Sequence, residues 1–279
     1  MKPMKQMDPD RLRNHIVSTY LSLRFGMGLI TFAFPVLVYV AGRYQGYDLQ
    51  CSLSAYYWAG ADGWFNARTV FVGSLFAIGA FFYLYKGFTQ AENIAFNLAA
   101  VFALLVALFP TSQPVCVDAP ADKLTLHGIS AVLLFVCLAY VVLFRARDTL
   151  PLVPPGRGRN NHAKVAGYER AYASAGALML ASPLTAYILN SFSGNGGSHF
   201  IFFIEAAGVW SFGLFWWLKS GELKSSSAVE HGLDRHIEVQ PTGRLTAQAR
   251  FSVAPDRPGD TQAINEAVVA AASDDEGRI

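Results

Sequence analysis

Three ionisable side chains, Arg68, His127 and Glu205, stand beside or inside long apolar segments of the sequence. Ionisable groups at membrane depth are costly, and each is by default a candidate for function. In a shared polar site, Glu205 could accept a proton and His127 could act as a general base or a hydrogen-bond donor. Ser54 could serve as a nucleophile with them. The spacing does not demand this triad, and an Arg68–Glu205 ion pair that only locks two helices together is an equally weighted interpretation.

The stretch SLSAYYWAGADGWFNARTVFVG, residues 52–73, places hydroxyls and aromatic rings directly before an apolar run. Such rings are typical of a membrane–water interface. We expect this stretch, with Asp62, to form the mouth of an outward-facing polar pocket, which Asn195, Ser198 and His199 could close. The candidate ligand-binding residues are Ser52, Ser54, Tyr56, Tyr57, Arg68, His127 and Glu205.

The elements that must position these residues are transmembrane helices. The chain is 53% hydrophobic and only 15% charged, against about 25% charged residues in soluble proteins. A membrane-spanning helix needs about 20 mostly apolar residues. Six segments meet this requirement: Leu23–Ala41, Thr69–Tyr85, Ile94–Phe109, Leu126–Phe144, Tyr172–Leu189 and Phe200–Leu218. The predicted fold class is therefore all-α, a polytopic membrane bundle of six transmembrane helices.

The distribution of Lys and Arg predicts the orientation, because positive charge favours the cytoplasmic side. Basic residues gather before the first segment and between the fourth and fifth. They are Lys2, Lys5, Arg11, Arg13, Arg145, Arg147, Arg157, Arg159, Lys164 and Arg170. The other side has Arg43, Arg68 and Lys123. We expect both termini in the cytoplasm and the chain in the inner (plasma) membrane.

Three regions follow from these boundaries. Residues 1–22 are predicted to be a cytoplasmic N-terminal segment and residues 23–219 the six-helix domain. Residues 220–279 are polar, without a sustained apolar period, and are predicted to be a disordered cytoplasmic tail.

Helix packing in lipid favours small residues, so Gly73, Ala77 and Ala80 predict one packing face. Arg24 is expected to extend toward the cytoplasmic headgroups. An inner interfacial belt is expected at Trp216, Trp217 and Lys219.

Cys51 and Cys116 fall in the two loops predicted to face outward, where a disulfide could form. Two free thiols are the alternative, because the sequence does not show the approach of the Cα atoms. Cys137 is expected to be a packing residue. No His-x-x-x-His or Cys-x-x-Cys pair occurs, and no metal site or cofactor is predicted. The net charge of +2 gives no argument for nucleic acid.

Several motifs resemble a bacterial family of uncharacterised six-helix integral membrane proteins. They are SLSAYY, ARTVFVGSLFAIGAFFYLYKG, NLAAVFALLVALFPTS, LHGISAVLLF and IEAAGVWSFGLFWWLKSGE, between about Ser52 and Glu222. The family pattern matches Ser52, Ser54, Tyr56, Tyr57, Arg68, Pro110, His127 and Glu205. Members often have an acid after the basic residue, where this chain has Thr69.

The resemblance implies the six-helix fold and no established reaction. The layout is more distantly similar to six-helix membrane proteins of lipid-anchor remodelling and autophagy. It is also loosely like the alkaline ceramidase and adiponectin-receptor superfamily, whose paired metal-binding histidines are missing here.

Taken together, these features predict an integral membrane protein that binds a small polar or lipid-headgroup ligand in an outward-facing pocket. Membrane lipid is the expected partner, and an enzymatic activity is left open. The alternatives are a proton-coupled transporter that uses Glu205 and a non-catalytic membrane scaffold. The sequence does not define an oligomeric state.

Overall fold

The structure is a computed structural model that describes residues 9–60, 63, 65–111, 125–152, 160–192, 199–226, 237–239 and 245–247. Most of these residues belong to α1 (Pro9–Tyr44), α2 (Ala67–Leu84), α3 (Gln90–Leu108), α4 (Leu126–Tyr140), α5 (Asn160–Phe192) and α6 (Phe200–Ser226). A 3₁₀ segment, η1 (Ser54–Tyr57), precedes α2. A π-helical segment, η2 (Val141–Arg145), and a 3₁₀ segment, η3 (Ala146–Leu152), follow α4.

Side-chain caps set the starts of α2, α3 and α4. Asn66, Thr89 and Thr125 each accept a hydrogen bond from the backbone N–H three residues further on, which satisfies one of the N–H groups that a helix start leaves free. Helix α1 begins at Pro9, a residue type that fits the first helical turn. It therefore starts well before Leu23, and residues 9–22 are continuous with the first apolar segment.

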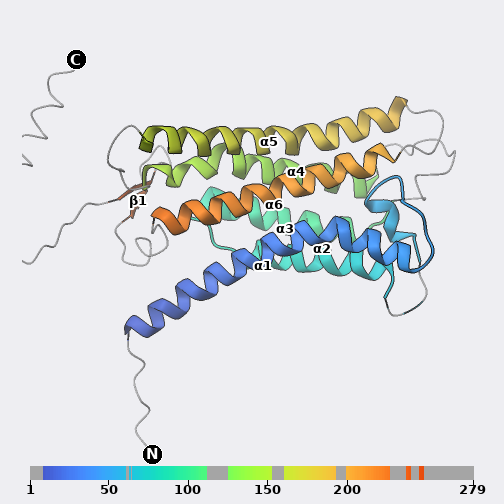
Figure 1. Cartoon of the computed structure of the whole chain (residues 1–279), viewed down its shortest axis with the longest axis horizontal. Helices are drawn as coiled ribbons and strands as arrows, with labels where there is room; N and C mark the ends of the chain where they lie inside the picture. The colour runs from blue at the N-terminus through green and yellow to red at the C-terminus, as the bar shows by residue number, and fades with distance from the viewer. Residues whose placement is uncertain are drawn as a thin grey trace, which may run out of the picture. The chain divides into compact units, whose positions relative to one another are not determined.

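The six helices form a closed ring. Each packs against the next in chain order, and α6 returns to pack against α1. Figure 1 shows them side by side along one common direction, with the N-terminal part of α1 leaving the bundle. One end of the ring holds η1 and the start of α6, and we call it the η1 end. The other holds the α2–α3 turn and the end of α6, and we call it the α2–α3 end.

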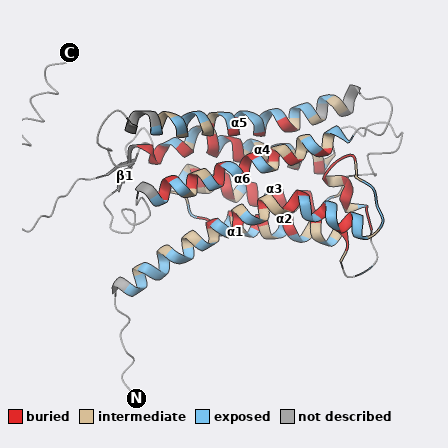
Figure 2. Cartoon of the chain, viewed as in Figure 1, coloured by how far each residue is buried: buried red, intermediate tan, exposed pale blue. Residues whose placement is uncertain are grey.

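The outer surface of the ring is apolar. Five helices, α1, α2, α3, α4 with the segments after it, and α6, are long and apolar enough to cross a membrane. Figure 2 shows buried positions facing the bundle and exposed positions facing outward. The outward side chains include Phe25, Leu29, Phe76, Leu108 and Leu214. Such a surface indicates a membrane protein, because soluble proteins rarely expose large apolar patches.

Small residues bring neighbouring helices together, but not at the predicted positions. A β-carbon at Gly73 would meet nothing within 4 Å, and Ala80 is exposed. The predicted packing face of Gly73, Ala77 and Ala80 is therefore wrong. Gly79 takes that role in α2, since a β-carbon there would lie 3.3 Å from the Ala100 carbonyl oxygen of α3.

The region predicted as a tail begins with ordered structure. Helix α6 continues past Lys219 to Ser226. Strands β1 (Ile237–Val239) and β2 (Leu245–Ala247) then pair antiparallel, with Ile237 opposite Ala247. The remainder of the predicted tail lies outside the described residues.

Candidate functional site

Glu205 lies on α6 at the η1 end, and its carboxylate binds the backbone of the loop that precedes η1. Oε2 of Glu205 accepts a hydrogen bond from the Leu53 N–H at 2.7 Å. One turn earlier on α6, the Phe202 N–H donates to the Cys51 carbonyl oxygen at 2.8 Å. These bonds hold the loop against the start of α6. Glu205 acts here as an anchor for that loop.

Arg68 and His127 also bind backbone carbonyl groups. Nε of Arg68 donates to the Tyr57 carbonyl oxygen at 2.8 Å, and its guanidinium lies over the Tyr57 ring at 4.7 Å. His127 is buried, with Nδ1 2.8 Å from the Phe109 carbonyl oxygen at the end of α3. Among the described residues, no ion pair joins Arg68 to Glu205, and no hydrogen bond links the side chains of Ser54, His127 and Glu205; Ser54 contacts the Glu205 carboxylate through its backbone N–H. The geometry thus favours separate structural contacts over a triad.

The serines and tyrosines of the predicted pocket mouth stabilise a turn. Oγ of Ser52 accepts from the Ala55 N–H at 3.0 Å and lies 3.1 Å from the Ser54 hydroxyl. The Tyr56 hydroxyl accepts from the Gln50 N–H at 3.3 Å. Burial raises the pKa of Tyr56, so this phenol stays protonated.

Other predicted residues are only partly covered by the structure. Asp62, Asn195, Ser198 and Cys116 lie outside the described residues, and His199 is exposed. Cys51 is disulfide-bonded, and Cys137 is a free thiol. The pairing of Cys51 with Cys116 stays a prediction.

The α2–α3 end holds a layer of buried ionisable side chains that the sequence analysis did not identify as a site. Its members come from α1, α3 and α6. The exposed fractions are 1% for Arg24, 8% for Glu92, 4% for Lys219 and 0% for Glu222. Ionisable residues at membrane depth face the bundle interior and mark functional sites by default. This layer is therefore the candidate functional site.

Arg24 lies at the centre of an aromatic cage. Its guanidinium carbon is 4.2 Å from the Trp216 ring centroid and 5.4 Å from that of Tyr85. Nε donates to the Ser220 hydroxyl at 3.0 Å, and Nη1 donates to the Tyr85 hydroxyl at 3.0 Å. The prediction that Arg24 extends to the headgroups is wrong. Trp216 is likewise buried rather than part of an interfacial belt.

Arg24 differs from the other buried charges because it lacks a carboxylate partner. None of the ion pairs among the described residues includes it. Its Nη2 atom and the Tyr20 hydroxyl, one turn earlier on α1, are buried without a hydrogen-bond partner in that part of the chain. The nearest acid in this network is Glu92, which reaches Arg24 only through the Tyr85 hydroxyl at 3.2 Å.

Glu92 is held in place by the start of α3. Its Oε2 accepts from the Phe88 N–H at 3.0 Å, and its own N–H donates to the Thr89 hydroxyl at 3.2 Å. This reciprocal arrangement is close to a capping box. The Glu92 carboxylate therefore caps the start of α3, where negative charge is favourable.

Lys219 and Glu222 form a second, fully paired group on α6. Nζ of Lys219 donates to Oε2 of Glu222 at 2.7 Å, to the Ala146 carbonyl oxygen at 2.5 Å and to the Thr149 hydroxyl. Glu222 also accepts from Thr149 at 2.6 Å and from Tyr172 of α5 at 2.6 Å. All three ammonium protons have an acceptor. The predicted interfacial position of Lys219 is therefore wrong.

The π and 3₁₀ segments after α4 make this second group possible. Helical geometry changes at Val141 and again at Ala146, which brings the Ala146 carbonyl and Thr149 to the Lys219 ammonium. Carbonyl groups near helix ends lack intrahelical partners and accept such bonds. In the sequence, the only signal for this group was the spacing of Lys219 and Glu222, three apart on one helix face.

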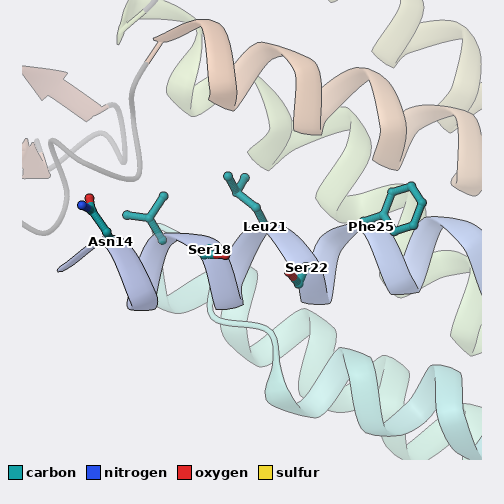
Figure 3. Close-up of a pocket in the computed structure, with 6 residues that line it drawn as sticks. Asn14, Ser18, Leu21, Ser22 and Phe25 are labelled. Carbon is teal, nitrogen blue, oxygen red and sulfur yellow. The ribbon is translucent and has the colours of Figure 1, made fainter. Parts of the chain in front are cut away.

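A surface groove of about 460 Å³ runs along the N-terminal part of α1. Figure 3 shows Asn14, Leu21 and Phe25 projecting from one side of this helix. The lining alternates polar and apolar side chains, and comprises Asn14, Val17, Ser18, Leu21, Ser22 and Phe25. Arg24 and Tyr20 do not line this groove, and with 3.6 residues per turn they lie on a different face of α1.

Across the part of the chain that the structure describes, no group of three or more His, Cys, Asp or Glu residues could hold a metal ion. Comparison of the chain with family models, curated proteins and solved structures found no match.

Proposed function

We propose that the chain is a six-helix integral membrane protein of the inner membrane, with both termini in the cytoplasm, that binds a small polar or lipid-headgroup ligand. The ring arrangement supports α5 as the sixth span, because α5 packs between α4 and α6. Its outward side chains include Leu178, Leu180, Leu184 and Ile188. The rest of the tail is expected to be disordered, and membership of the uncharacterised six-helix family fits this arrangement.

The proposed ligand site is the α2–α3 end, on the cytoplasmic side, rather than the outward-facing pocket. The observation that carries the proposal is Arg24, a buried cation without a carboxylate partner among the described residues and with an unpaired Nη2 atom. An uncompensated buried charge is strongly destabilising, and cation–π contacts supply only about 0.5–2 kcal/mol each. A bound acceptor group would complete the pairing of Arg24.

The depth of Arg24 supports a ligand that comes from the membrane interface. At about 1.5 Å per residue, Tyr44 lies about 30 Å along α1 from Arg24, which equals the thickness of the hydrocarbon core. On α6, Lys219 lies about 28 Å from Phe200 by the same rise. With Tyr44 and Phe200 at one boundary of the hydrocarbon layer, both cations would lie near the other boundary.

Native mass spectrometry of the protein extracted from its membrane tests this proposal. The wild type should retain a bound small molecule or lipid, and Arg24→Met should lose it, because the guanidinium is removed while the length of the side chain is kept. Arg43→Met is the matched control, since Arg43 is on the same helix but is half exposed and paired with Asp48. Equal retention in all three proteins, or no bound molecule in any, would show that Arg24 holds no ligand.

A reporter fusion series tests the topology. A cytoplasmic fluorescent reporter should be active when fused after Lys224 and inactive when fused after Gly46. Activity at both positions would contradict the proposed orientation.

A further inference from the structure

We propose that the ligand at Arg24 carries a phosphate group, and that Arg24 Nη2 and the Tyr20 hydroxyl donate hydrogen bonds to its oxygens. This inference rests on the proposed function, because it names the chemistry of the ligand at the same site. The phosphate could belong to a phospholipid headgroup or to a free phosphate ion. Neither source is assigned by the geometry of the donors alone.

The arrangement of donors points to a bound acceptor. Nε and Nη1 of Arg24 already donate to Ser220 and Tyr85, while Nη2 has no partner among the described residues. The Tyr20 hydroxyl faces the Arg24 guanidinium and the Tyr85 hydroxyl, but its contact with neither has hydrogen-bond geometry. Buried polar groups in native proteins nearly always have partners. One oxygen placed between Nη2 and the hydroxyl would satisfy both.

The placement of the carboxylates leaves room for an anionic acceptor at Nη2, although the two cations and two carboxylates of the layer balance in number. Lys219 has its own carboxylate in Glu222, and that pair is saturated by Thr149 and Tyr172. Glu92 touches Tyr85 and the backbone before α3, not Arg24. An acceptor at Nη2 therefore faces a guanidinium from which the Glu92 carboxylate is separated by the Tyr85 hydroxyl. Guanidinium groups bind phosphate particularly well, because their planar N–H donors match its oxygens.

The surroundings favour phosphate over a carboxylate. With Tyr44 at one edge of the hydrocarbon layer, Arg24 would lie near the other edge, next to the headgroup region that contains the phospholipid phosphates. Arg11 and Arg13 precede the groove on the same helix and would favour anionic lipid.

The buried site lies close to the point where α1 leaves the bundle. From Arg11 to Leu23 no residue of α1 is buried, and Arg24 is the first buried residue of that described stretch. Figure 1 shows this part of α1 separating from α6. Tyr20 is only partly buried as a residue, but its hydroxyl and Arg24 Nη2 are covered. A headgroup that approaches along α1 would therefore have to displace the side chains that cover these two atoms.

The test is a ligand titration of delipidated protein in detergent, read as the melting temperature. The probes are phosphatidylglycerol, inorganic phosphate and diacylglycerol, which lacks phosphate. Phosphatidylglycerol should raise the melting temperature of the wild type, and diacylglycerol should not. If inorganic phosphate gives the same saturating shift, the source is free phosphate; if only the lipid does, the source is a headgroup.

Tyr20→Phe tests the proposed contact, because it deletes a hydroxyl whose contacts with Arg24 and Tyr85 lack hydrogen-bond geometry. It should weaken binding of the phosphate probe about 10-fold to 100-fold, as expected for a hydrogen bond to a charged group. Without ligand it should be at least as stable as the wild type. Tyr39→Phe, on the same helix but away from the site, should bind like the wild type. Arg24→Lys, which loses the planar donor pair, should also bind more weakly.

The inference is wrong if neither phosphate probe shifts the melting temperature, if diacylglycerol acts equally well, or if Tyr20→Phe binds like the wild type. These failures are distinct from failure of the proposed function. An Arg24-dependent ligand without phosphorus in the mass spectra would preserve the proposed function and refute phosphate.

Discussion

Replacement of Glu222 by Gln should be among the most destabilising conservative changes in this protein. The substitution keeps the shape of the side chain and removes the charge that pairs with Lys219. Glu222 is fully buried and accepts hydrogen bonds from Lys219, Thr149 and Tyr172. Glu222→Gln would leave the buried ammonium without an anionic partner, with neutral acceptors alone: the Ala146 carbonyl, the Thr149 hydroxyl and the amide oxygen where it faces Lys219.

The size of the effect follows from this geometry. Removal of one member of a buried ion pair costs about 3–5 kcal/mol, because the remaining charge stays buried without compensation. For a chain of this size, the loss corresponds to a fall in melting temperature on the order of 10 °C. A Lys219→Met/Glu222→Gln double variant should recover most of the stability, since no charge remains and the introduced amide oxygen can still accept from Thr149 or Tyr172.

The assay is unfolding of the detergent-solubilised protein, followed by tryptophan fluorescence, for the wild type, both single variants and the double variant. The double variant should be clearly more stable than the sum of the two single losses implies, which is the signature of direct coupling. A Glu222→Gln loss below about 1 kcal/mol, or strictly additive losses, would refute the assignment of a buried ion pair.

Two further predictions concern the η1 end and the helix contacts. Glu205→Gln should lower the free energy of unfolding by only about 1 kcal/mol, because an amide oxygen can still accept from the Leu53 N–H and no cation is left unpaired. A loss of stability as large as that of Glu222→Gln in the same unfolding experiment would contradict this prediction, because it would require a cationic partner for Glu205. Gly208→Val should cost about 1–3 kcal/mol by overpacking, because a β-carbon there would lie 2.9 Å from Ser182 Cβ of α5. Gly73→Val, with open space around it, is the control, and equal losses in the two glycine variants would contradict this packing.

The sequence was sufficient to locate the helices but not their partners. Local hydropathy places each of the six predicted segments almost wholly within a helix, because the length of an apolar run is a local property. The Arg24–Ser220 contact joins residues 196 positions apart, and no periodicity within one segment specifies it. The same limit explains the wrong packing face of α2, since only the approach of α3 distinguishes Gly79 from Gly73.

The candidate site shows that the position of a charged residue in the sequence does not predict which groups its side chain contacts. Arg24 and Lys219 stand at the ends of apolar segments, where long basic side chains normally reach the headgroups. That rule failed here because other parts of the fold supply inward partners. Trp216 and Tyr85 cover the guanidinium, and the 3₁₀ turn after α4 presents Thr149 to the ammonium. Glu205 was predicted as a site residue, but its carboxylate binds the backbone N–H of a loop residue. Every non-proline residue carries such a group, so the sequence does not identify this partner.

The two ends of the bundle satisfy their buried polar groups by different means, and the difference bears on where function resides. At the η1 end, Glu205, Arg68 and His127 each bind a backbone group, so their charges and protons serve to fix loops. At the α2–α3 end, ionisable side chains bind one another, and Lys219 with Glu222 reaches full saturation. Arg24 alone among these four charges keeps an unpaired buried donor. A structural role explains every other member of the layer, whereas the cost of leaving Nη2 unpaired is recovered only when something binds there.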